Sequence, residues 1–102
     1  MAITAAFMPQ AATANIAVTA SSASVALNAS TGFTGNQVRV YNYGTAIAYI
    51  AFGTASTVTA TTASLPIAPN SIEVFGIPYG TTYAAALGTS GGTVYFTLGE
   101  GL

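Results

Sequence analysis

Only three side chains in this sequence carry a full charge at neutral pH: Arg39, Glu73 and Glu100. Histidine, cysteine, lysine and aspartate are absent, which excludes a His/Cys metal cluster, a thiol or imidazole nucleophile and a lysine Schiff base. A pair of carboxylates could still serve glycoside hydrolysis. However, Glu100 lies in a tail of sequence GEGL, which is a poor place for a preorganised acid. We therefore expect no enzyme activity, no catalytic or metal-binding residue, no cofactor and no small-molecule substrate.

The charge balance also narrows the possible partners. Charged residues make up 3% of the chain, against about 25% in an ordinary soluble domain, and the net charge is −1. We expect no nucleic-acid partner, because phosphate backbones are bound through clustered Lys and Arg. We expect no membrane partner, because the longest apolar run, residues 46–52, is far shorter than the about 20 residues of a spanning helix. No Lys or Arg precedes the first apolar stretch, so we expect no cleaved signal peptide.

Short runs of β-branched and aromatic residues, separated by glycine, proline and asparagine, indicate strands rather than helices. The expected strands are residues 15–19, 24–28, 37–43, 46–52, 57–61, 71–77, 82–87 and 93–98. About eight short strands predict an all-β fold, a single antiparallel β-sandwich of jelly-roll-like form over residues 14–102. Residues 1–13 show no strand alternation and are expected to form an extended N-terminal arm.

Two hairpins are expected within this sandwich. Residues 42–45, of sequence NYGT, fit a tight turn between strands 37–43 and 46–52, and Gly91-Gly92 suits a second turn that needs positive φ. In this interpretation Val38 and Val40 face the core of a central hairpin.

Strand alternation then places Arg39 and Tyr41 on the face of their strand away from the core, and gives Glu73 and Phe75 a common face. We expect both charges to lie on the outward face of a β element, or on a face that something else covers. One interpretation is a pair of solvated charges worth about 0–1 kcal/mol. The other is a polar contact across a subunit boundary, where a desolvated pair fixes register more than it adds affinity.

Tyrosines and threonines allow two further interpretations. The tyrosines are Tyr41, Tyr43, Tyr49, Tyr79, Tyr83 and Tyr95. Core or interface positions are favoured over a sugar-stacking platform, because tryptophan is absent and no acid is available to orient sugar hydroxyls. The threonine-rich run at residues 57–62 is interpreted as an edge strand, since a single run without a repeat makes no flat ice-binding array.

Isolated β domains protect their edges with lysine, proline or inward-pointing charges, and this chain has no lysine and one arginine. A surface with so little charge favours self-association. We therefore expect the protein to be packed against identical copies and a larger assembly.

Several stretches resemble small virion proteins of tailed bacteriophages: AVTASSASVAL at 17–27, VRVYN at 38–42, TAIAYIAFG at 45–53, AAAL at 84–87 and TVYFTLGEG at 93–101. The resemblance spans about residues 15–101 and is one of texture and motif order. It implies a head decoration (cement) protein with a jelly-roll-like fold, located on the capsid surface of the virion and made in the host bacterial cytoplasm. It also implies two partners, the major capsid protein and further copies of the chain, as a homo-dimer or homo-trimer over joints between capsid subunits.

The interface residues expected on this basis are Phe7, Met8 and Pro9 of the arm together with Arg39, Tyr41, Glu73 and Phe75. An oligomer that binds the expanded shell and not its precursor would stabilise the expanded state by mass action. The alternative is a glycan- or host-binding β-sandwich module of a phage tail or fibre. A third interpretation is a surface-layer or fibre subunit that polymerises alone.

Overall fold

The computed structural model describes residues 8–9, 12–27, 37–78, 80–88 and 92–100. In these ranges the chain is β-structure and loops, and no helix there is long and apolar enough to span a membrane. The strands are β1 (Met8–Pro9), β2 (Ala14–Val18), β3 (Ala23–Ala26), β4 (Gln37–Tyr43), β5 (Ala48–Gly53), β6 (Leu65–Ile67), β7 (Ser71–Gly76), β8 (Tyr83–Gly88) and β9 (Gly92–Glu100).

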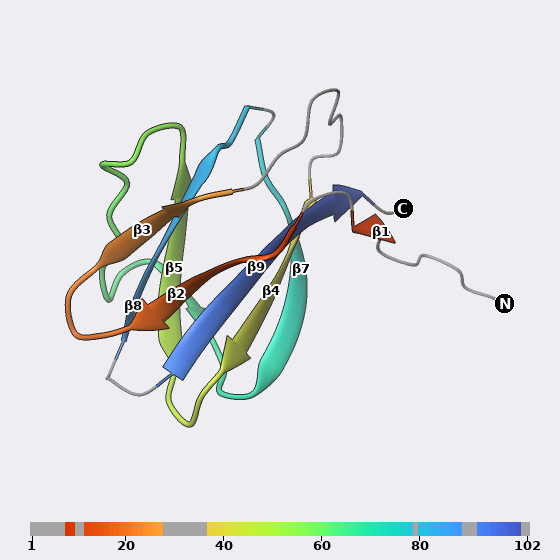
Figure 1. Ribbon diagram of the computed structural model, residues 1–102. Coiled ribbons are helices and arrows are strands. Elements are labelled where there is room, and N and C mark those ends of the chain that lie inside the picture. The colour runs from red at the N-terminus through yellow and green to blue at the C-terminus, as the bar shows by residue number, and fades with distance from the viewer. Residues whose placement is uncertain (1–7, 10–11, 28–36, 79, 89–91, 101–102) are drawn as a thin grey trace, which may run out of the picture.

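The strands form two antiparallel sheets packed face to face (Figure 1). In the larger sheet β4 lies between β7 and β9, and β9 is paired on its other side by β2 and, further along, by β1. The smaller sheet has the order β3-β8-β5-β6. Within the two sheets the pairs are nested along the sequence: β2 pairs with β9, β3 with β8, β4 with β7 and β5 with β6. This is the strand order of an eight-stranded jelly roll with β1 added, and it confirms the predicted all-β sandwich.

The interior is apolar because apolar side chains occupy every second position of the strands that line it. Burial alternates strictly along β2 and along most of β4. Val38 and Val40 are fully buried, as predicted, and belong to one cluster with Phe96 of β9 and with Ile50 and Ile67 of the smaller sheet. Burying a side chain of this size contributes about 1.5–3 kcal/mol, so this cluster is the main source of stability.

One predicted strand is wrong: residues 57–61 form no strand, and β6 lies further along the chain. Polar side chains in this stretch bond to nearby backbone instead. Thr59 Oγ1 donates to the Thr57 carbonyl at 3.0 Å, and Ser64 Oγ accepts from the Thr61 amide at 2.9 Å. Such local bonds compete with a strand ladder. β6 contains Pro66, which an edge strand tolerates because one side of its backbone is unpaired.

The predicted hairpins are also wrong. β4 lies in the larger sheet and β5 in the smaller one, so residues 44–47 cross between sheets. The same holds for β8 and β9, on either side of the expected turn at Gly91-Gly92. Two strands joined by a short turn were expected to pair with each other, whereas each of these strands takes its partners from elsewhere in the chain.

Asn42 holds this end of the sandwich together. Its side chain is 1% exposed, and its Nδ2 donates to the carbonyl oxygens of Ala46, Ile67 and Ala68 at 3.0, 3.1 and 3.2 Å. Ala46 belongs to the β4–β5 crossover, while Ile67 and Ala68 lead into the β6–β7 crossover. One buried amide therefore bridges two of the connections between the sheets.

Residues 54–64 fold over the outer face of the smaller sheet. They leave β5 and reach β3, where Ser24 Oγ donates to the Ser56 carbonyl at 2.8 Å. Because β8 lies between β5 and β3, the segment crosses it. Ala84 and Ala86 of β8 face the core, so Ala85 between them points to the outer side of the sheet. Ala85 is nevertheless fully buried. This part of the smaller sheet is thus covered by the chain itself.

The predicted N-terminal arm is in part a strand. Met8 and Pro9 pair as β1 with Glu100 and Gly99 of β9, although we expected no strand before residue 14. Residues 1–7 and 10–11 of the expected arm lie outside the described residues.

Candidate functional site

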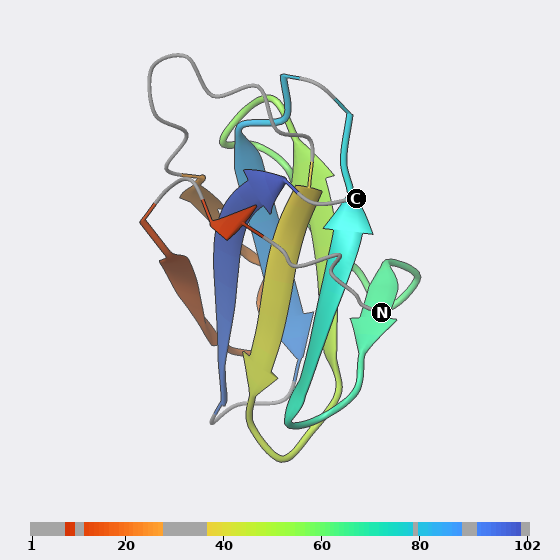
Figure 2. The ribbon, with the colours of Figure 1, turned by 90° about the vertical axis from the view of Figure 1, so that its right-hand side faces the viewer.

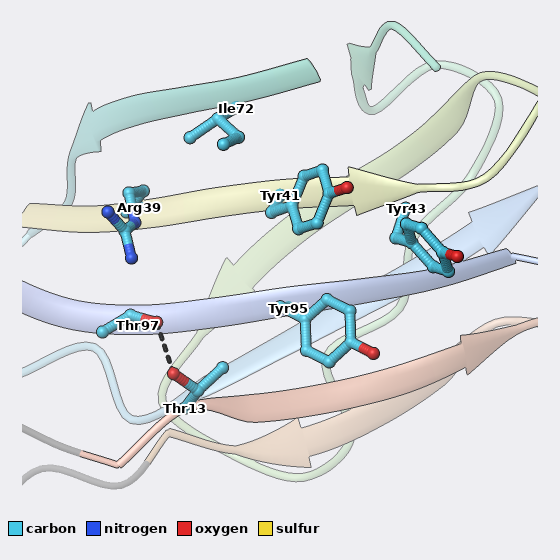
Figure 3. A pocket seen from close by; sticks show the side chains of 7 residues that line it. All are labelled: Thr13, Arg39, Tyr41, Tyr43, Ile72, Tyr95 and Thr97. Atoms are coloured by element: carbon cyan, nitrogen blue, oxygen red, sulfur yellow. Dashed lines mark hydrogen bonds between the residues drawn. The ribbon is translucent and has the colours of Figure 1, made fainter. Parts of the chain in front are cut away.

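The outer face of the larger sheet gathers the aromatic and polar side chains that alternate with the core residues of β4 and β9. Tyr41 lies opposite Tyr95 and Arg39 opposite Thr97, and residues opposite each other in an antiparallel pair point to the same side of the sheet. Figure 3 shows these side chains together on one side of the two strands. We call this surface the tyrosine face; its residues are Thr13, Arg39, Tyr41, Tyr43, Ile72, Tyr95 and Thr97.

Three aromatic rings form the centre of the tyrosine face. The ring centroids of Tyr41 and Tyr95 are 6.0 Å apart with planes inclined by 20°, and those of Tyr41 and Tyr43 are 5.8 Å apart with planes inclined by 53°. These distances are in the range in which aromatic rings attract one another. All three hydroxyl groups point toward the end of the sheet at which β4 ends (Figure 3). The cluster thus combines apolar ring surface with aligned polar tips.

An open hollow of about 450 Å³ lies over this face. Its volume is in the range of small-ligand sites. A hydrogen bond of 2.7 Å between Thr13 Oγ1 and Thr97 Oγ1 joins the start of β2 to β9 on one side of it. Among the described residues that line the hollow, Arg39 is the one charged side chain, and it is exposed.

Large apolar side chains extend the tyrosine face toward β7. Ile72 is 58% exposed, Val74 45% and Tyr43 58%. Ile72 lies opposite Tyr41 and Val74 opposite Arg39, so they share one surface with the tyrosines. Figure 2 looks onto this sheet, with β9, β4 and β7 in front and strands of the smaller sheet behind. The tyrosine face is therefore a broad surface rather than a deep cleft.

The predicted outward orientation of Glu73 and Phe75 is wrong. They do share a face, but it is the inner one, since Glu73 lies opposite Val40 and Phe75 opposite Val38. Phe75 packs against the core, whereas Glu73 is exposed because β7 is the last strand of its sheet. Alternation alone gives two possible orientations for a strand, and only the pairing with β4 decides between them.

The structure thus brings together two of the predicted interface residues, Arg39 and Tyr41, and separates Glu73 and Phe75 from them. Pro9 is exposed in β1, and Met8 is its neighbour in that strand. Phe7 lies outside the described residues. Whether any of these residues contacts a partner stays a prediction.

Five side chains of the tyrosine face were not among the predicted interface residues: Thr13, Tyr43, Ile72, Tyr95 and Thr97. A signal for two of them was present in the sequence. In β9, Tyr95 and Thr97 alternate with residues of the core cluster such as Phe96, so alternation could have placed them on the outer face. Ile72 could not be found in this way, because an isoleucine in a strand is normally assigned to the core and the sequence does not show that this one is exposed.

The two carboxylates that could have served glycoside hydrolysis lie on different strands. Glu73 is level with Val40, and Glu100 lies one residue beyond the pair Gln37 and Gly99, with β4 between β7 and β9. Ideal strand dimensions then put their Cα atoms roughly 16 Å apart. The two carboxylates are therefore carried by strands that are not neighbours, with β4 between them.

Comparisons with protein-family models, with curated proteins and with solved structures find no match for this chain.

Proposed function

We propose that this protein is a structural virion protein that binds the outer surface of the expanded bacteriophage head and stabilises joints between major capsid subunits. The proposal combines the resemblance of its sequence motifs to head decoration proteins with a fold that viral capsid proteins also use. A fold by itself does not define a function. The observation that carries the proposal is therefore the tyrosine face.

The tyrosine face has the composition of a protein-binding surface. Tyrosine and arginine are enriched in such interfaces, and lysine and glutamate are depleted. Tyr43, Ile72 and Val74 expose large apolar areas, which a soluble protein rarely leaves uncovered. A relatively flat surface of this kind suits the outside of a shell. Binding there would act as a clamp, because a protein that binds only the expanded shell shifts the equilibrium toward it.

The experiment is co-sedimentation of the purified protein with expanded heads that lack it. The wild-type chain is expected to saturate the heads, and Tyr43→Ala with Ile72→Ser is expected to lower the affinity at least about tenfold, as for interface residues of this size. Thr57→Ala is the matched control, because Thr57 is exposed in the segment that covers the other sheet. Equal affinity of the double variant and the wild type would exclude the tyrosine face as the docking surface. Absence of wild-type binding to heads would exclude the function.

A glycan-binding module of a tail or fibre is the second candidate, and one observation favours it. The nearly parallel rings of Tyr41 and Tyr95 lie beside an open hollow of about 450 Å³, and the apolar face of a sugar ring can stack on such rings. This candidate predicts that the isolated protein is retained on immobilised bacterial surface glycans and that Tyr95→Ala abolishes retention. Decoration predicts no retention for either protein.

A further inference from the structure

The charges of this protein are confined to one of its two layers. Arg39 is in β4, Glu73 in β7 and Glu100 in β9, all strands of the larger sheet. The four strands of the smaller sheet, of sequences ASVA, YAAALG, AYIAFG and LPI, contain no charged residue. The strands of the smaller sheet therefore have no charged side chain that would oppose contact between its outer side and another apolar surface.

The covering segment leaves part of this outer side open. An apolar hollow of about 430 Å³ lies beside it, and its lining residues are Ala20, Ala46, Ile47, Tyr49, Thr62, Leu87 and Gly88. Ile47 is 46% exposed at this hollow. Its backbone is held tightly against β8, because a Cβ added to Gly88 would be 2.9 Å from the Ile47 carbonyl oxygen. A firmly placed apolar projection and an apolar hollow thus share one surface.

Such a surface is complementary to itself. In a two-fold symmetric contact each copy presents the same patch, so a projection and a hollow that lie side by side on one copy can each meet the other on its partner. The tyrosine face is less suited to this, because two copies that met through it would bring two Arg39 side chains together. Strand addition at β6 is opposed by Pro66, which lacks an N–H to donate.

We propose that two copies of this chain associate back to back through the outer side of their smaller sheets, with Ile47 of each copy in the hollow of the other. An interface of ordinary size covers about 800 Å² on each partner, roughly one seventh of the 5379 Å² accessible surface of the chain. The hollow alone is smaller than this. The contact therefore extends along β6 to Pro66, which is exposed and lies opposite Tyr49 of the hollow. The absence of charge suits such a contact, since no ion has to lose its water.

This arrangement leaves the tyrosine faces on the two outer sides of the dimer. It rests on the smaller sheet alone and not on the proposed capsid binding. The two proposals can therefore fail separately: one is measured on the purified protein in solution, the other with heads.

The test is sedimentation equilibrium of the purified full chain, with circular dichroism to verify folding. The wild type is expected to be a dimer at micromolar concentration, and Ile47→Glu is expected to raise the dissociation constant at least about 100-fold, because each copy would bury an unpaired carboxylate. Ile72→Glu is the matched control, since it makes the same change at an exposed isoleucine of the tyrosine face. It is expected to leave the dimer intact.

A second variant protects the test against misfolding of the first. Thr62 is exposed and lines the same hollow, so Thr62→Glu is expected to weaken the dimer without disturbing the core. A wild-type protein that stays monomeric up to about 100 μM, well above the range of a specific dimer, would overturn the proposal. So would a dimer that Ile72→Glu dissociates while folded Thr62→Glu leaves it unchanged.

Discussion

Asn42 is the most deeply buried polar residue among those described, and its amide nitrogen donates to three carbonyl oxygens. The amide has two hydrogens, so at least one of them is shared between two carbonyls. These carbonyls belong to two different connections between the sheets. A single side chain thus fixes where the chain leaves one layer and enters the other.

Replacing Asn42 with alanine is expected to lower the free energy of unfolding by about 2–4 kcal/mol, because the carbonyl oxygens lose their donor inside the protein. Urea unfolding measures this difference. Asn15→Ala is the control, since Asn15 is exposed in β2, and its effect is expected to stay within about 0.5 kcal/mol. Similar losses for the two variants would show that Asn42 has no special role in joining the crossovers.

Glu73 has a different orientation from the one that the sequence suggested. It lies on the inner side of β7, an edge strand that carries the exposed apolar residues Ile72 and Val74. A strand added beside β7 would bury the Glu73 carboxylate. Inward-pointing charges of this kind are one means by which β proteins prevent pairing at their edges.

Glu73→Val is therefore expected to promote disordered aggregation through β7, visible as an increase in light scattering over time. Glu73→Lys is the control, because it reverses the charge and keeps the barrier to burial. If the valine variant stays as dispersed as the lysine variant, the charge at this position does not protect the edge.

At the scale of elements, strand positions were easier to predict than strand partners. β4 has the predicted bounds, and β2, β3, β5, β7, β8 and β9 overlap their predicted ranges. These strands are recognised by local alternation of apolar residues. The hairpins and the orientation of Glu73 were wrong, because they depend on pairing between distant segments. β6 was missed because it is three residues long and contains Pro66, which is a signal against a strand.

β1 gives the N-terminal arm a fixed position at one end of the larger sheet. Deleting residues 2–12 removes β1, which pairs with the last two residues of β9, and leaves β2 in place. The sandwich is expected to remain folded, and binding to expanded heads is expected to weaken because Phe7, Met8 and Pro9 are lost as anchors. Full occupancy of heads by a folded deletion variant would remove the arm from the proposed interface.

At the scale of the whole molecule, the two layers have different surfaces. The larger sheet holds every charged residue and the tyrosine face, whereas the smaller sheet is free of charge and partly covered by residues 54–64. The sequence alone indicated a charge-poor surface that needs a partner. It could not indicate that the charges share one layer, because that depends on which strands pair.

A protein with so few charges is expected to respond weakly to salt. Raising the ionic strength from about 0.05 to 0.5 M screens interactions between charges, and this chain has three charged residues. Its thermal midpoint is therefore expected to change by no more than about 2–3 °C, as measured by circular dichroism. Dimer dissociation is expected to be equally insensitive. A strong decrease of the thermal midpoint at high salt, or a strong increase in the dissociation constant of the dimer, would show that ion pairs contribute more than burial.

The nested pairing also determines when the fold can form. β9, the last of the described strands, lies beside β4 and pairs with β2 and β1 on its other side. On a translating ribosome, the larger sheet therefore stays without one of its central strands until β9 has left the exit tunnel. Pairing between such distant segments is slow, and unpaired strand edges are exposed in the meantime. During synthesis the strands that pair with β9 thus keep an unpaired edge that a chaperone can bind until β9 arrives.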